Sequence, residues 1–203
     1  MKRTIAALLV LGLPIGATPL AAKRLPPSPL EGVWKTDCRP IGKNGRHGFI
    51  TRLEVKGRAL TATTQIYAHN TCDTATVGTA YRGEIVRTAI AADGAIDFDH
   101  VVLAVTMTAD APDVVTTYNA NDTSGCGMGG GWQIGVPRGV EGRYCAPFTF
   151  PAVGVQLYER AWVAGDDLRI GSFPAVWNNT SPDKRPMTPG TMVFHRLTSR
   201  RET

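Results

Sequence analysis

The sequence predicts an all-β protein, a closed or half-open barrel of antiparallel strands that is held by two disulfides. Three observations favour this class. Apolar and polar residues alternate with a period of two in several segments. Turn-forming sequences separate these segments at intervals of about ten residues, as in β-sandwiches and barrels. The 22 Gly and 14 Pro residues suit short strands joined by turns better than long helices.

The first expected strands alternate clearly. Residues 32–38 carry Val33 and Trp34 after a glycine. Residues 60–66 and 77–85 repeat apolar, small and aromatic side chains at every second position. In residues 48–56, one face holds Phe49, Thr51, Leu53 and Val55, and the other holds Ile50, Arg52, Glu54 and Lys56.

The later strands follow from their residue types. Residues 101–108 are β-branched and almost wholly apolar, which favours a strand buried on both faces. The remaining expected strands are residues 114–118, 153–159, 167–170 and 191–197, and residues 132–134 also have strand character. We expect at most one short helix and two long loops, at residues 120–131 and 174–189.

The composition is that of one globular domain. With 203 residues, of which 43% are hydrophobic and 19% are charged, the chain can bury a core but is short for two domains. This apolar content excludes intrinsic disorder. No apolar run after the N-terminus approaches the roughly 20 residues that a membrane-spanning helix needs, so we expect a protein that does not span the membrane.

The first 22 residues have the pattern of a signal peptide. Lys2 and Arg3 precede an apolar stretch over residues 5–17, and a run of small residues ends at Ala22. A single anchoring helix is the alternative, but the stretch is short and Pro14 interrupts it. We therefore expect cleavage after Ala22 and a periplasmic or secreted protein.

Cleavage there divides the chain into three parts: a signal peptide (1–22), a Pro-rich leader (23–30) that we expect to be an exposed arm, and one barrel domain (31–203). Loss of Lys2 and Arg3 from the 22 basic residues leaves 20 against 17 acidic residues, a net charge of +3. Because these charges are scattered, the sequence predicts no nucleic-acid partner.

All four cysteines lie in the part expected to be exported: Cys38, Cys72, Cys126 and Cys145. An even count in an oxidising compartment favours two disulfides, and four cysteines allow three connectivities. We favour Cys38–Cys72 and Cys126–Cys145 because each joins nearest neighbours in sequence, and each would stabilise the fold by about 3–4 kcal/mol. A zinc site is the alternative, but no Cys-x-x-Cys spacing supports it, so we expect no metal.

No catalytic constellation stands out, so we expect neither an enzyme nor a cofactor. On a strand, Asp97 and Asp99 share one face while His100 points the other way. This pattern suits a cation site or, more simply, a solvent-facing strand beside a turn. The Gly-rich loop around Cys126 has no Lys and no following helix, so it predicts no phosphate site.

Small and aromatic residues suggest a cavity inside the barrel. Small side chains occupy alternate strand positions that we expect to face inward: Thr51, Ala62, Thr64, Thr79 and Thr106. Small residues inside a wide barrel leave volume for a ligand. We expect ligand-binding or plugging roles for Trp34, Tyr67, Tyr81 and Trp132, although each of them could simply belong to the core.

Several motifs resemble those of known exported domains. Gly32-Val33-Trp34 contains the Gly-x-Trp that lipocalins carry on their first strand, where the Trp closes one end of the barrel. It is followed by Cys38, residues 49–52 and 65–67, Asn70-Thr71-Cys72 and Tyr81-Arg82-Gly83-Glu84. Together with Gly142-Arg143-Tyr144-Cys145 and residues 157–158, 167–171 and 184–196, these segments resemble the domain named for adenomatosis polyposis coli down-regulation. The resemblance spans most of residues 30–197.

This resemblance implies a secreted, disulfide-linked, lipocalin-like β-barrel, and it supports the Cys38–Cys72 pair. The animal members are Wnt antagonists associated with a lipid-modified ligand in a partly open barrel, and the domain also occurs in bacterial exported proteins. The family supplies no catalytic residues.

We therefore interpret the chain as an exported, non-enzymatic protein that binds an apolar or amphipathic small molecule, such as a lipid, in a barrel cavity. One alternative is an envelope or extracellular protein-interaction module that acts through loops 120–131 and 174–189, with a partner that the sequence does not identify. A second alternative is a hydrolase or metal enzyme that uses Asp99 or His100.

Overall fold

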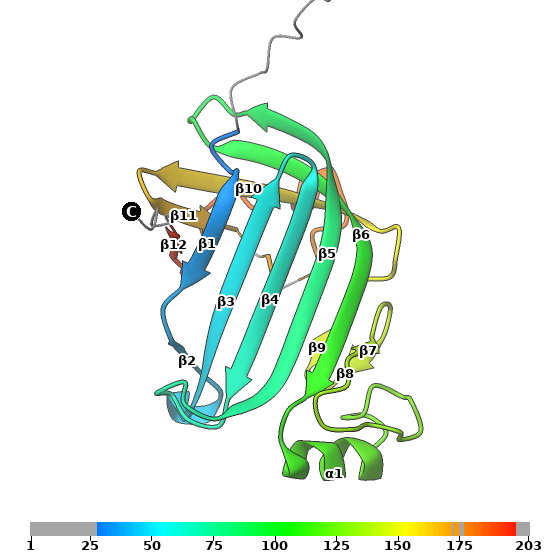
Figure 1. The fold of residues 1–203 in the computed structure, drawn as a ribbon. Helices are drawn as coiled ribbons and strands as arrows, with labels where there is room; N and C mark the ends of the chain where they lie inside the picture. Colours follow the sequence, from blue (N-terminus) through cyan, green and yellow to red (C-terminus); the bar gives the residue numbers. More distant parts are fainter. Residues whose placement is uncertain (1–27, 172, 175–176, 198–203) are drawn as a thin grey trace, which may run out of the picture.

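The computed structural model describes residues 28–171, 173–174 and 177–197, and the expected signal peptide lies outside this range. Eight antiparallel strands form a closed barrel in chain order, which confirms the expected fold class (Figure 1). Each strand pairs with the next, and the last returns to the first. They are β1 (Gly32–Thr36), β3 (His47–Lys56), β4 (Ala59–Tyr67), β5 (Ala75–Ile90), β6 (Ile96–Ala109), β10 (Gln156–Ala164), β11 (Asp167–Ile170) and β12 (Phe194–Arg196).

Four short strands, one α-helix and two short 3-10 helices, η1 (Lys43–Gly45) and η2 (Pro182–Lys184), complete the described chain. β2 (Arg39–Ile41) continues beside β3, and β7 (Arg138–Gly139) pairs with β6. β8 (Tyr144–Cys145) and β9 (Phe148–Thr149) form a separate hairpin. Helix α1 (Pro112–Ala120) lies at one end of the barrel (Figure 1). No helix in the described ranges is long and apolar enough to cross a membrane.

Strand pairing around the barrel is complete at one end and interrupted at the other, and the candidate site lies at the interrupted end. β6 pairs with β10 only through Ile96–Val101. Farther along β6, Thr106 and Met107 pair instead with the two-residue strand β7. Strand hydrogen bonds therefore close the barrel fully at one end. At the other end, the insertion between β6 and β10 (residues 110–155) covers the side of the barrel where these two strands no longer pair.

The strand alternation predicted for residues 48–56 is confirmed in β3. Thr51, Leu53 and Val55 are buried, whereas Arg52 and Lys56 are exposed. The side chains point alternately into and out of the barrel because successive residues of a strand face opposite sides. The inward residues of the neighbouring strands fill the closed end as a continuous core that includes Trp34, Leu53, Leu60, Val102, Leu168 and Phe194.

The expectation that residues 101–108 are buried on both faces is wrong. In β6, Val102 and Val105 are buried, but Leu103 is 42% exposed. The strand belongs to a single-layered barrel wall, so its outer face meets solvent even where the sequence is apolar.

The expected strand at residues 114–118 is also wrong, because these residues lie in helix α1. Pro112 at the start of the helix and Asp113 in its first turn suit a helix N-terminus, and they outweigh the β-branched residues that follow. Residues 132–134 form no strand either, apart from one isolated bridge between Ala109 and Ile134.

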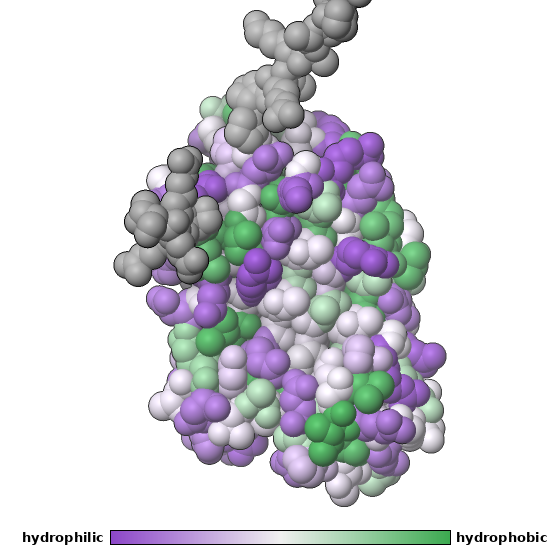
Figure 2. All heavy atoms as spheres, viewed as in Figure 1, coloured by the Kyte–Doolittle hydropathy of each residue, from purple (hydrophilic) through white to green (hydrophobic). Residues whose placement is uncertain are grey.

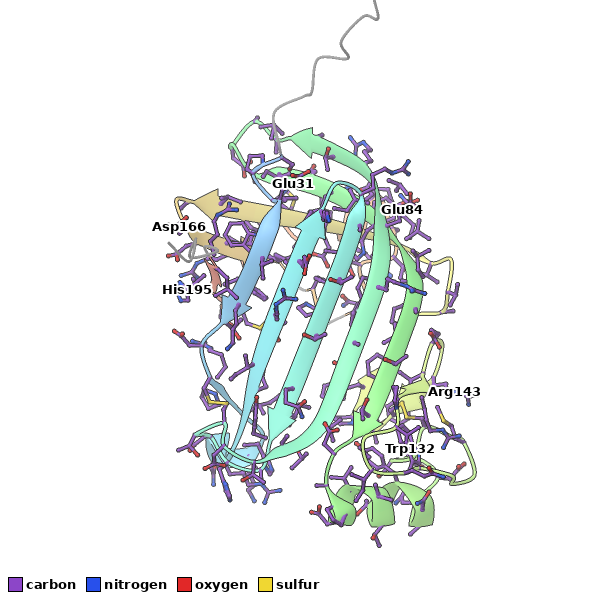
Figure 3. The ribbon with its side chains drawn as sticks, viewed as in Figure 1. Glu31, Glu84, Trp132, Arg143, Asp166 and His195 are labelled. Carbon is purple, nitrogen blue, oxygen red and sulfur yellow. A yellow bond between two sulfur atoms is a disulfide. The ribbon has the colours of Figure 1, made fainter. Side chains whose placement is uncertain are left out.

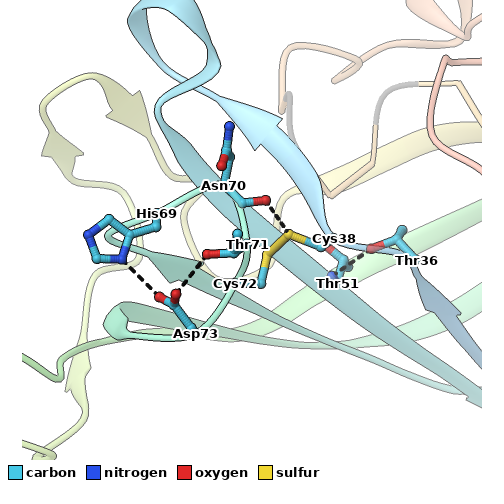
Figure 4. Close-up of a disulfide and its surroundings, with 8 residues drawn as sticks. All are labelled: Thr36, Cys38, Thr51, His69, Asn70, Thr71, Cys72 and Asp73. Atoms are coloured by element: carbon cyan, nitrogen blue, oxygen red, sulfur yellow. Dashed lines mark hydrogen bonds and ion pairs between the residues drawn. A yellow bond between two sulfur atoms is a disulfide. The ribbon is translucent and has the colours of Figure 1, made fainter.

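The two disulfides pair as predicted, Cys38 with Cys72 and Cys126 with Cys145. Cys38–Cys72 ties the β1–β2 junction to the β4–β5 connection (Figure 4). Gly48 lies beneath it, and a Cβ there would approach Cys72 Sγ to 2.6 Å. The Asn70 carbonyl oxygen lies 3.0 Å from Cys38 Sγ, which carries no hydrogen because it is part of the disulfide.

A polar turn flanks this disulfide. His69 Nδ1 lies 2.9 Å from Asp73 Oδ1, and the Thr71 hydroxyl donates to Asp73 Oδ2 at 2.7 Å (Figure 4). These two hydrogen bonds hold the pKa of Asp73 at about 2. His69 and Asp73 are exposed, so this contact orders the loop locally and adds little to global stability.

The end of the expected leader is not an exposed arm. Leu30 is buried, and its carbonyl oxygen accepts a hydrogen bond from Trp34 Nε1 at 2.9 Å. The chain is therefore fixed to the barrel from Leu30 onward.

Candidate ligand-binding site

The barrel contains a half-open cavity of about 90 Å³, toward the end where β6 no longer pairs with β10. Its lining is largely apolar and comes from the long strands on one side and from loops on the other. The lining residues are Ile41, Phe49, Thr51, Ala62, Thr64, Ile66, Thr79, Ala80, Tyr81, Val105, Phe148, Phe150, Pro174, Trp177 and Met192.

The strand side of the cavity includes four of the five small residues that the sequence predicted to face inward. Thr51, Ala62, Thr64 and Thr79 line the cavity. The hydroxyls of Thr51 and Thr64 lie 2.9 Å apart, so one of them donates a hydrogen bond to the other. Thr106 does not line the cavity, because β6 directs Val105 and Met107 inward and Thr106 outward.

The opposite side of the cavity is aromatic. Phe148 and Phe150 reach it from hairpin β8–β9, and Trp177 reaches it from the segment before β12. Trp177 packs 5.3 Å from the ring of Tyr81 and 6.5 Å from that of Phe150. These residues replace the strand wall that is missing at this end. No period-two pattern marks them, because they lie in a two-residue strand and a loop.

Disulfide Cys126–Cys145 anchors this hairpin. Cys145 lies in β8 and pairs in register with Phe148 of β9. The disulfide joins β8 to the loop that follows α1, and both cysteines are buried. The hairpin forms no other strand pairing among the described residues, so this disulfide is its main covalent constraint.

Of the four predicted ligand-binding aromatics, only Tyr81 lines the cavity. Tyr67 lies on the outer face of β4, where it borders a shallow depression on the surface. Figure 2 shows this face as a pale region over the middle of β3, β4 and β5. Trp132 lies beside α1, outside the barrel, with its ring 5.0 Å from that of Tyr118 (Figure 3).

Trp34 is fully buried in the core of the closed end. The Arg196 guanidinium stacks on its ring at 3.8 Å and donates to the Glu31 carbonyl oxygen at 2.6 Å. Gly32 makes room for this arginine, since a Cβ there would lie 2.6 Å from Arg196 Nη1. The Gly-x-Trp spacing therefore has a local steric cause.

A buried polar layer lies beneath the cavity. Tyr81 Oη lies 2.6 Å from His100 Nδ1, and Asn179 Nδ2 donates to Glu159 Oε1 at 2.6 Å. Burial lowers the pKa of His100 to about 3, so the imidazole is neutral at physiological pH. Burial and the negative charge of Glu159 raise the pKa of the Tyr81 phenol, which stays protonated.

Asp97 and Asp99 face outward and His100 faces inward, as the strand pattern predicted. The expected solvent-facing strand is wrong for Asp99, which is buried under Arg185 at 2.5 Å. Arg160 binds Asp97 at 2.6 Å. Arg160 and Arg185 therefore neutralise these two carboxylates.

The same arginine, Arg185, also fixes loop 174–189, which the alternative interpretation assigned to protein interaction. Arg185 also donates to the Glu159 carbonyl oxygen at 2.5 Å, and Asn179 is buried against β10. The middle of this loop therefore packs on the barrel. Loop 120–131 is also tethered, through Cys126.

In comparisons with known proteins, no protein-family model and no curated protein matches the chain.

Proposed function

We propose that the protein is a non-enzymatic binding protein that holds a slender apolar group, such as an alkyl chain, in its barrel cavity. The observation that carries this proposal is the cavity lining. Four inward positions on three adjacent strands are Thr or Ala where larger residues would complete the core. A cavity lined by apolar atoms and methyl groups favours an apolar occupant over water.

The size of the cavity limits what it can hold. At about 90 Å³ it is well below the roughly 300–1,000 Å³ of pockets that enclose whole drug-sized ligands. The proposed ligand therefore inserts only a narrow part of itself. The buried carboxylate of Glu159 lies close enough to raise the pKa of Tyr81, and it disfavours a negatively charged group at the inner end.

The proposal includes export to an oxidising compartment, as for the secreted domains that the sequence resembles. Two disulfides and no free cysteine among the described residues support this location. Kinship with the adenomatosis polyposis coli down-regulated domain remains part of the proposal, supported by the lipocalin-like barrel and by the Cys38–Cys72 pair.

Adjacent threonines on β4 provide the test. Thr64 faces the cavity, and its neighbour Thr63 is exposed on the outer face. Thr64→Leu fills the cavity and should weaken the binding of 1-octanol by about tenfold, measured by isothermal titration calorimetry. Thr63→Leu adds the same side chain outside and should leave the affinity unchanged. Equal affinities for both variants, or no binding to the wild-type protein, would contradict the proposal.

A further inference from the structure

The barrel cavity shares its aromatic wall with a groove on the outer surface. This groove has a volume of about 530 Å³ and lies between hairpin β8–β9 and residues 177–180. Phe148, Phe150 and Trp177 line both the cavity and the groove. One layer of side chains therefore separates the small apolar cavity inside the barrel from a larger groove outside it.

This shared wall can open without breaking the barrel. β8 and β9 pair with each other and with no other described strand. Phe148 and Trp177 are half-buried, so each has a solvent-facing side into which its ring can rotate. Side-chain rotation of this kind is much faster than strand separation. The side of the barrel covered by hairpin β8–β9 and Trp177 can therefore admit a ligand. The other end, where strand hydrogen bonds close the barrel, has no such entrance.

The chemistry of the groove is apolar with neutral polar groups. Pro147, Pro151 and Val155 provide apolar surface. The side chains of Thr149, Asn178 and Thr180 provide hydroxyl and amide groups. None of the residues lining the groove carries a charge. A carboxylate or phosphate seated there would lose hydration with no cation to compensate, whereas a hydroxyl group could exchange hydrogen bonds.

Building on the proposed function, we infer that the cavity and the groove form one bipartite site for a single-chain amphiphile with an uncharged, hydroxyl-bearing head. The end of the chain fills the cavity, the chain passes between Phe148 and Trp177, and the head lies in the groove. The small cavity volume requires such a division, because a whole amphiphile does not fit inside.

Head-group selectivity tests this inference. Octyl β-glucoside and octanoate both carry eight-carbon chains but differ in the charge of the head. Titrated below their micellar concentrations into the protein with both disulfides formed, octyl β-glucoside should bind about tenfold more tightly than octanoate. 1-Octanol serves as the reference for the cavity alone.

A charge introduced into the groove should shift this selectivity. Thr180 is exposed and lines the groove, so Thr180→Arg places a cation there at little cost to folding. This variant should raise the affinity for octanoate relative to octyl β-glucoside by about threefold, the size of an exposed ion pair. Thr63→Arg, on the outer face of β4, is the matched control and should leave the ratio unchanged.

The outcomes separate the inference from the proposed function. If 1-octanol binds but the two head groups bind equally, or if Thr180→Arg and Thr63→Arg give the same ratio, the groove is not the head-group site and the inference is wrong. If none of the three ligands binds the wild-type protein, the proposed function fails and the inference fails with it.

Discussion

At the residue scale, Tyr81 joins the candidate site to the core. One side of its ring lines the cavity, and its hydroxyl lies 2.6 Å from His100 Nδ1 in the buried layer beneath. His100 Nε2 is buried with no hydrogen-bond partner among the described residues. The sequence placed His100 on the strand face opposite Asp97 and Asp99, but it did not show that Tyr81, on the neighbouring strand, would meet it.

This buried histidine predicts a specific pH dependence of stability. The pKa of His100 falls from 6.5 to about 3 on folding, so below pH 6.5 the unfolded chain binds a proton that the folded chain excludes. Stability should decrease as the pH falls from 6.5 toward 3, by up to about 1.4 kcal/mol per pH unit from this group. His100→Gln should flatten the slope in urea titrations across this range. An unchanged slope would show that His100 is not buried in the neutral form.

The packing of the Tyr81 side chain also depends on the absence of a side chain at Gly83. A Cβ at Gly83 would overlap the Tyr81 hydroxyl, whereas a Cβ at Gly78, on the same strand, would meet nothing closer than Asp110 Oδ2 at 3.3 Å. Gly83→Ala should therefore destabilise the protein by about 1–3 kcal/mol through overpacking. Gly78→Ala should be neutral or slightly stabilising, because Gly is unfavourable within strands. Chemical denaturation compares the two, and a similar loss in both would refute the steric role of Gly83.

At the element scale, hairpin β8–β9 is the part that completes the cavity. It replaces barrel strands where β6 no longer pairs with β10, and disulfide Cys126–Cys145 tethers it. The sequence predicted this disulfide from the nearest-neighbour pairing of cysteines. It did not predict the role of the hairpin, because two-residue strands carry no readable alternation.

The two disulfides should therefore have separable effects. In the chain-entropy model, losing Cys38–Cys72, which spans 34 residues, costs about 4 kcal/mol of stability, and losing Cys126–Cys145, which spans 19, costs about 3 kcal/mol. Only the Cys126→Ser/Cys145→Ser variant should also weaken 1-octanol binding, because it releases the wall that carries Phe148 and Phe150. The measurements are urea denaturation and calorimetric titration, under conditions where each variant is folded. Equal affinity in the two double variants would contradict this role of the hairpin.

Other elements show where sequence patterns succeed and fail. The alternation of β3 was predictable because one face is buried and the other is solvated along its whole length. The β-branched residues Val114, Val115 and Thr116 predict a strand over residues 114–118. They form a helix because Pro112 and Asp113 favour a helix start.

At the scale of the whole molecule, the barrel class followed from strand spacing and turns, but the location of the cavity did not. The cavity exists because short strands close only one end of the barrel, while residues 110–155 and the segment before β12 cover the other. Which end is closed by strands and which by loops depends on pairing between strands far apart in the sequence, and local sequence patterns do not show this pairing. For the same reason, Trp132 and Tyr67 resembled Tyr81 in sequence but lie outside the barrel.

The central claim is that an apolar chain occupies the space between Thr64 and the aromatic wall. Nuclear Overhauser contacts between bound 1-octanol and isotope-labelled methyl groups test it most directly. We expect contacts from the octanol chain to the methyl groups of Thr64, Ile66 and Val105, all of which line the cavity, and none to Thr63. Contacts confined to surface methyl groups, with the Thr64 and Val105 methyls silent, would contradict it.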